Sequence, residues 1–252
     1  MAFIRCVHQR YGEGIQVIDW TGEQGLQIGR TVVRDKHLLR ATWVLIFLTA
    51  ITSMAIHFLS GDMRAIPFFI SESDFPGPQR VVFKTGFTSA GVLMCALAMR
   101  VPHTFDIANE KHSQLAKGFG MTAGVTLVGL AWFNMHEQII IHSIFAMASF
   151  IGGYAWSCTV HHALSNAPSL GHTRRKVWMV VGAVSFAVMN LSLAGAVRTH
   201  VIDGGLRNGV EIMNLSQNSI VFAATAEYIL YLSLVVMLAS FEHDLALAKQ
   251  QD

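Results

Sequence analysis

The sequence predicts an all-α membrane protein: a bundle of six transmembrane helices with a small N-terminal cytoplasmic extension that reads as a β-hairpin. Two observations carry this prediction. Hydrophobic residues make up 52% of the chain and charged residues only 13%, about half the charged share of soluble domains, so lipid is the natural solvent. The 252 residues also suit six spans of about 20 residues each with their connections.

Six apolar stretches are long enough to cross a bilayer. Lys84 and Lys117 lie near the starts of the second and third stretches, where a lysine side chain can extend its ammonium back to the headgroups. None of the stretches alternates in the manner of a membrane β-barrel strand. The predicted spans cover residues 41–60, 81–99, 115–133, 139–160, 177–197 and 220–241.

Lysine and arginine are distributed unevenly between the two sides of these spans. Twelve fall on the side of the N-terminus and four on the other side, which predicts that both termini are cytoplasmic. The chain then divides into an N-terminal extension (1–40), a six-span domain (41–245) and a tail (246–252). The twelve are Arg5, Arg10, Arg30, Arg34, Lys36, Arg40, Arg100, Lys111, Arg174, Arg175, Lys176 and Lys249; the four are Arg64, Arg80, Arg198 and Arg207.

Composition and spacing also indicate how the chain folds and what it lacks. The net charge of +2 is too small to indicate nucleic acid as a partner. The three cysteines lie far apart without C-x-x-C spacing, and no cleaved signal peptide is expected, because the first long apolar run begins near residue 41.

The third connection is so short that its two helices must be antiparallel neighbours. Small residues predict close helix packing at Gly120, Gly124, Gly152 and Gly153.

The extension before the first span reads as strand, turn, strand. The predicted strands are 15–20 and 26–33, with the turn at 21–25. An isolated hairpin is marginal in water, so it would rest on the bundle or on a partner protein. Disorder is the alternative, and the content of Ile, Val and Trp makes it the weaker one.

No catalytic signature appears, so the motifs assign no cofactor and no catalytic residues. G-x-S-x-G, phosphate-loop and dinucleotide glycine patterns are missing from the sequence. His136 and His142 are six residues apart, whereas a zinc protease helix places its histidines four apart. For His161, His162 and His172 an interfacial role is preferred over metal binding, and no metal is expected.

Four polar residues within the spans have similar predicted depths. His57, His142, Asn190 and Glu227 all fall roughly 5–12 Å below the outer interface. An ionised carboxylate in hydrocarbon is costly, so Glu227 should face the bundle interior and hydrogen-bond to a polar residue of another helix, with His142 as the favoured partner. Two interpretations stay open: a network that sets helix register, or a polar site that opens to the outer leaflet.

The arrangement of spans and motifs resembles the Frag/DRAM/Sfk family of six-span membrane proteins. An acidic residue followed by an aromatic one lies in the sixth span (Glu227-Tyr228), and His142 lies early in the fourth. The closing segment 238–244 is also similar. The loop after the first span carries a proline–aromatic–isoleucine–serine–acid signature, with one extra residue here. Its residues are Pro67, Phe68, Phe69, Ile70, Ser71 and Glu72.

The resemblance implies a role in lipid handling or membrane trafficking, because family members act in autophagy, in remodelling of lipid-anchored proteins and in phospholipid homeostasis. It supplies no catalytic residue. We therefore expect a non-enzymatic protein that binds or organises membrane lipids or membrane partners. The alternatives are an accessory subunit docked through residues 1–40, and a lipid-modifying enzyme or transporter that uses the outer polar cluster.

Three basic residues precede the fifth predicted span. Arg174, Arg175 and Lys176 are expected to form a loop that faces anionic lipid, where each cation contributes about 1 kcal/mol. Three charges fall short of the four to eight typical of a dedicated phosphoinositide site. Setting the topology is therefore the preferred role, and lipid recognition is the alternative.

Overall fold

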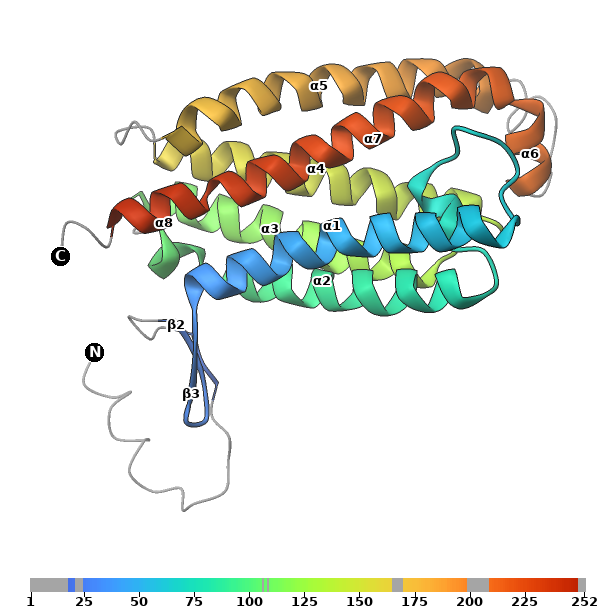
Figure 1. Ribbon diagram of the computed structural model, residues 1–252. Helices are drawn as coiled ribbons and strands as arrows, with labels where there is room; N and C mark the ends of the chain where they lie inside the picture. Colours follow the sequence, from blue (N-terminus) through green and yellow to red (C-terminus); the bar gives the residue numbers. More distant parts are fainter. Residues whose placement is uncertain are drawn as a thin grey trace.

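Six long helices form the bundle shown in Figure 1, a computed structural model that describes residues 18–20, 25–105, 107, 109–164, 170–198 and 209–248. All six are long and apolar enough to cross a membrane, which confirms the predicted fold class. The helices are α1 Asp35–Ser60, α2 Pro78–Thr104, α3 Glu110–Trp132, α4 Ile139–Ala163, α5 Leu170–Val197 and α7 Gln217–Ser240; shorter ones are η2 Ile70–Ser73, α6 Gly209–Leu215 and α8 Glu242–Ala248.

Local signals explain where several helices begin and end. Pro78 occupies the first turn of α2, where its missing N–H costs nothing. Asn109 caps α3 by accepting a hydrogen bond from the backbone N–H of His112 at 3.2 Å, and Gly61 ends α1 with a φ of 76°. Helices α1 and α5 begin several residues before their predicted spans, because hydropathy locates only the apolar part of a helix that continues into the interface.

The helices pack mainly against their sequence neighbours. Helix α1 packs against α2, α2 against α3 and α3 against α4, while α5 packs against α7, which also contacts α1 and α4. The predicted pairing of the third and fourth spans is therefore confirmed. Close helix packing is also confirmed at three glycines: a Cβ at Gly120, Gly124 or Gly152 would lie within 3.0 Å of atoms of a neighbouring helix, whereas one at Gly153 would meet its nearest atom at 3.7 Å.

The N-terminal extension contains a three-stranded antiparallel sheet in the order β1 (Ile18–Asp19), β2 (Gly25–Ile28) and β3 (Thr31–Arg34). The predicted pairing holds between β1 and β2. The second predicted strand, however, is divided into β2 and β3 by a turn in which Gly29 has a φ of 59°. The Arg100 side chain of α2 donates to the carbonyl oxygen of Trp20 and forms an ion pair with Asp35, so the sheet is fixed to the bundle.

The bundle has two distinct ends (Figure 1). The sheet and α8 lie at one, which we call the sheet end; η2, α6 and the connection between α3 and α4 lie at the other, which we call the cap end. The connection 61–77 does not extend away from the cap end. It folds back onto the helices, and Phe68, Phe69, Ile70 and Glu72 are all buried.

Candidate functional site

The loop between α1 and α2 is attached to the middle of α7. The backbone N–H of Ile70 donates to Glu227 Oε2 at 2.8 Å, and the hydroxyl of Tyr228 donates to the carbonyl oxygen of Phe68. The loop and the Glu-Tyr pair, which lie about 160 residues apart in the sequence, therefore form one structural unit. Ile70 was not predicted as a partner, because a backbone N–H carries no sequence signal.

Ion pairs and hydrogen bonds hold the same loop in shape. Glu72 is 1% exposed; it forms an ion pair with Arg64 at 3.2 Å and accepts from the backbone N–H of Phe69 at 3.0 Å. Arg64 also donates to the side chain of Gln217, at the start of α7. Ser71 donates to Met135 Sδ at 3.1 Å, and Pro67 is half-buried. The motif is therefore bound to the α3–α4 connection, to α7 and to its own backbone.

Glu227 points inward as predicted, but its predicted hydrogen bond to His142 is wrong. It is 7% exposed, and its described hydrogen-bond partner is Ile70. His142 Nδ1 instead bonds to the carbonyl oxygen of Phe133 at 2.7 Å, and its Nε2 has no partner among the described residues. The short α3–α4 connection places that carbonyl within reach, so a local hydrogen bond satisfies one of the two ring nitrogens.

The other two members of the predicted cluster also make local contacts. Asn190 donates to the carbonyl oxygen of Phe186 in its own helix at 2.8 Å. His57 is 1% exposed, and its ring packs against those of Phe68 and Phe75 at centroid distances of 5.3 and 5.8 Å. A four-residue hydrogen-bonded network is therefore not present in the described part of the chain.

Three of the four nevertheless line one cavity. A space of about 820 Å³ lies between α4, α5 and α7, with α6 and η2 at the cap end, and His142, Asn190 and Glu227 are part of its wall. The remaining wall is mostly apolar, with Met147, Phe150, Met189, Leu193 and Ile220 among its residues. The depths predicted for the polar residues along their helices therefore located the polar part of the cavity wall. The apolar part could not be predicted, because its residues resemble those of any surface that faces lipid.

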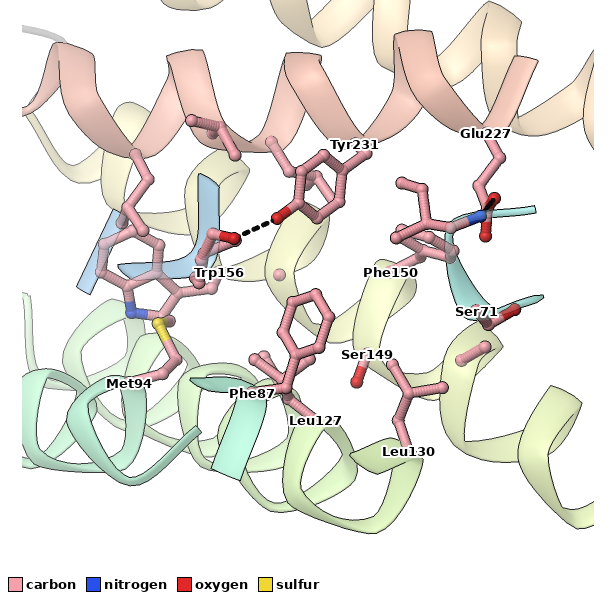
Figure 2. A pocket seen from close by; sticks show the side chains of 18 of the residues that line it. Ser71, Phe87, Met94, Leu127, Leu130, Ser149, Phe150, Trp156, Glu227 and Tyr231 are labelled. Carbon is pink, nitrogen blue, oxygen red and sulfur yellow. Dashed lines mark hydrogen bonds between the residues drawn. The ribbon is translucent and has the colours of Figure 1, made fainter. Parts of the chain in front are cut away.

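A second, smaller cavity of about 110 Å³ lies deeper in the bundle and shares five lining residues with the first: Ser71, His142, Ala146, Phe150 and Glu227. Figure 2 shows Glu227 and Ser71 at one end of it and Met94 and Trp156 at the other. The hydroxyl of Tyr231 donates a hydrogen bond to the carbonyl oxygen of Ile46. The shared wall means that Glu227 and His142 separate the open cavity from the interior.

The cavity walls combine a few polar groups with a largely apolar surface. A carboxyl, an imidazole and an amide within a largely apolar wall can hydrogen-bond to hydroxyl or amide groups of an apolar ligand. No group of three or more histidine, cysteine or acidic side chains with metal-binding geometry occurs among the described residues. Arg198, which lies at the C-terminal end of α5 and is exposed, adds one cation to the wall of the larger cavity.

Asp74 and His136 add two titratable groups to the cap end, outside the spans. Burial raises the pKa of the Asp74 carboxyl from 3.8 to about 6, although Arg80 Nε lies 3.4 Å from Asp74 Oδ1 and opposes the shift. Burial lowers the pKa of His136, whose Nε2 lies 3.1 Å from the carbonyl oxygen of Glu72. Neither residue was predicted as part of a site.

Replacing Asp74 by asparagine should stabilise the protein in a pH-dependent way. Because the folded pKa is above the unfolded value, the folded state binds more protons between pH 3.8 and about 6, and wild-type stability falls as pH rises through that window. The gain in melting temperature of Asp74→Asn should therefore be absent below pH 3.8, grow up to pH 6 and stay constant above it. Thermal melts across this range test it, with Glu110→Gln, at an exposed position at the start of α3, as control; a difference independent of pH would contradict it.

The basic segment at the sheet end differs from its prediction. Arg174, Arg175 and Lys176 lie in the second turn of α5 rather than in a loop. Arg175 is 0% exposed, lies 2.5 Å from Asp244 and stacks over the Phe241 ring at 4.1 Å. It cannot face lipid, because α8 and the end of α7 cover it. Arg174 and Lys176 are exposed.

The fold and the buried loop–α7 unit define a multi-pass membrane protein with an apolar cavity within the membrane-spanning region. The chain belongs to the family described as Frag1/DRAM/Sfk1/Cwh43P N-terminal domain, whose family model matches residues 37–248. The family resemblance is therefore confirmed. No curated protein and no solved structure matches the chain.

Proposed function

We propose that this protein is a non-enzymatic membrane protein that binds a lipid in the cavity between α4, α5 and α7, as part of a role in lipid homeostasis, trafficking or autophagy. The observation that carries the proposal is the cavity itself. Its volume of about 820 Å³ falls within the range of small-molecule sites, and its wall has the usual composition of such sites, apolar with a few polar groups.

The polar groups indicate which part of a lipid would lie deepest. Glu227 uses Oε2 for the loop, which leaves its other carboxyl oxygen for a ligand, and His142 Nε2 is buried without a partner among the described residues. A buried polar atom without a partner costs about 1–3 kcal/mol. A lipid hydroxyl placed between these two groups would remove that cost, so the proposed ligand is a lipid with a small hydroxyl-bearing headgroup.

Filling the cavity should displace the lipid. Ala194 is exposed on α5 and lines the cavity, so Ala194→Trp should occupy the space at low cost to folding; Ala187→Trp, two turns earlier on α5 and outside the cavity wall, is the matched control. Lipid that copurifies from mild detergent, measured by mass spectrometry, should fall severalfold for Ala194→Trp only. Equal lipid in both variants would refute the site, and chemical turnover of the lipid would indicate an enzyme instead.

We also propose that both termini face the cytoplasm. The twelve-to-four distribution of Lys and Arg supports this. In a background without the native cysteines, Glu137→Cys at the cap end should react with an impermeant thiol reagent on intact cells, and Thr173→Cys at the sheet end should react only after permeabilisation. Both positions are exposed. The reverse pattern would invert the orientation, and labelling of both from one side would reject the six-span arrangement.

A second candidate function is that of an accessory subunit docked through residues 1–40. The N-terminal sheet supports it, because Ile18, Ile28 and Val32 are 48%, 38% and 47% exposed, and exposed apolar groups on a small sheet suit a protein interface. A stable stoichiometric partner that copurifies with the full chain, and is lost from Val32→Glu, would favour this function over lipid binding alone.

A further inference from the structure

We propose that a groove at the sheet end, separate from the central cavity, binds the phosphate and part of one acyl chain of an anionic phospholipid. The groove has a volume of about 530 Å³ and lies between the first turns of α1, the second turn of α5 and the end of α7. It contains none of the residues that line the two cavities near Glu227 except Val235, so it does not depend on the function proposed above.

The rim of the groove carries two cations that form no ion pair within the described ranges, although Lys36 is close enough to Glu242 to lower the pKa of that carboxyl. Lys36 of α1 and Arg174 of α5 both line it, and neither forms an ion pair with any residue in the described ranges. Arg174 Nη1 lies 3.3 Å from His243 Nε2, a contact within the same groove that involves no acidic side chain. Two cationic side chains that come from different helices and line the same groove are suited to binding a phosphate group between them.

The acidic residue in the groove is already neutralised. Glu242 accepts from Arg40 Nε at 3.0 Å and from the indole N–H of Trp43 at 2.8 Å. Its negative charge is therefore directed toward α1 and compensated by Arg40. The groove retains a net positive charge from Lys36 and Arg174, which makes it complementary to an anion.

The floor of the groove indicates a lipid rather than a soluble phosphate compound. Below the cations, the wall consists of Trp43 and Phe47 of α1 and Leu232, Val236 and Ala239 of α7. Leu232 to Ala239 spans roughly 10 Å along the helix axis, enough for the first part of an acyl chain. An aromatic residue at the level of the headgroups and an apolar wall beneath it are typical of the membrane interface.

The structure also supplies a matched control within the same basic segment. Arg174 lines the groove, whereas Lys176 is exposed elsewhere on α5 and does not. Lys111, exposed at the start of α3, likewise lies at the sheet end outside the groove. Lys36→Glu/Arg174→Glu and Lys111→Glu/Lys176→Glu therefore change the net charge equally at the same end of the bundle.

The experiment titrates purified full-length protein in detergent with dioctanoyl phosphatidylinositol 4-phosphate, with dioctanoyl phosphatidylcholine and inorganic phosphate as separate arms. We expect saturable binding of the anionic lipid that is weakened roughly tenfold or more by Lys36→Glu/Arg174→Glu and changed less than twofold by the control pair. Binding should also weaken with added salt. Lys36→Gln/Arg174→Gln should show an intermediate loss with an unchanged melting temperature, which separates lost contacts from lost folding.

Three results would overturn the proposal. An equal loss in the control pair would mean that general surface charge attracts the lipid. Equal binding of phosphatidylcholine would mean that the groove recognises only acyl chains. Binding of inorganic phosphate as tight as that of the lipid would mean that the apolar floor takes no part.

Discussion

Replacing Arg175 by methionine should lower the free energy of unfolding by about 3–5 kcal/mol, because it breaks the ion pair with Asp244 by removing its fully buried partner. The guanidinium is fully buried and contacts Asp244 at 2.5 Å, His161 Nδ1 at 3.3 Å and the Ser240 hydroxyl at 3.4 Å. These contacts join α4, α5, the end of α7 and α8. Their loss should release α8 from the bundle.

The neighbouring lysine provides the control. Lys176 is exposed one residue away, so Lys176→Met should change the free energy of unfolding by less than about 0.5 kcal/mol. Arg175→Met/Asp244→Leu should recover part of the stability, since it removes both members of the ion pair. Thermal or denaturant unfolding in detergent measures all three. Equal stability of Arg175→Met and Lys176→Met would show that the buried pair does not hold the sheet end together.

Replacing Glu227 by leucine should destabilise the cap end by about 1–3 kcal/mol, because the buried N–H of Ile70 loses its acceptor. Glu227→Gln keeps an oxygen that can accept the same hydrogen bond, so its melting temperature should stay close to that of the wild type. Thr225→Val, at an exposed position two residues earlier on α7, is the control. Thermal melts of the three variants test the structural part of the prediction.

The same pair of substitutions separates attachment of the loop from lipid binding. If Glu227 also binds the lipid in the central cavity, Glu227→Gln should reduce copurified lipid while the protein remains as stable as the wild type. Unchanged lipid in a stable Glu227→Gln protein would confine Glu227 to holding the loop. A melting temperature of Glu227→Leu equal to that of Glu227→Gln would instead contradict the role of the Ile70 hydrogen bond.

The site was only partly predictable from the sequence, and the reason differs between residues. The predicted depths below the outer interface placed His142, Asn190 and Glu227 at one level, and in the structure all three line one cavity. The same comparison could not exclude His57, whose ring packs under the loop instead. Depth along a helix follows from residue number, whereas direction around the bundle depends on which helices are neighbours.

The basic segment at the sheet end also shows the difference between what residue number predicts and what depends on the neighbouring helices. Charge counting treats Arg174, Arg175 and Lys176 as equivalent, but a helix turns each successive side chain by about 100°. Arg174 therefore reaches the groove beside α1, Arg175 is buried against Asp244, and Lys176 faces outward. Three adjacent residues of the same charge thus have three different environments.

The sequence by itself determined the six membrane-spanning helices, the short α3–α4 connection and the close packing at Gly124, because each depends on hydrophobicity or residue size within one segment of chain. Only the tertiary structure decided that Glu227 holds Ile70, 157 residues away, and that Arg175 is paired with Asp244, 69 residues away. The physical reason is that burial and hydrogen bonding are properties of pairs. The type of a residue shows that it requires a partner when it is buried, but the tertiary structure determines which group is close enough to be that partner.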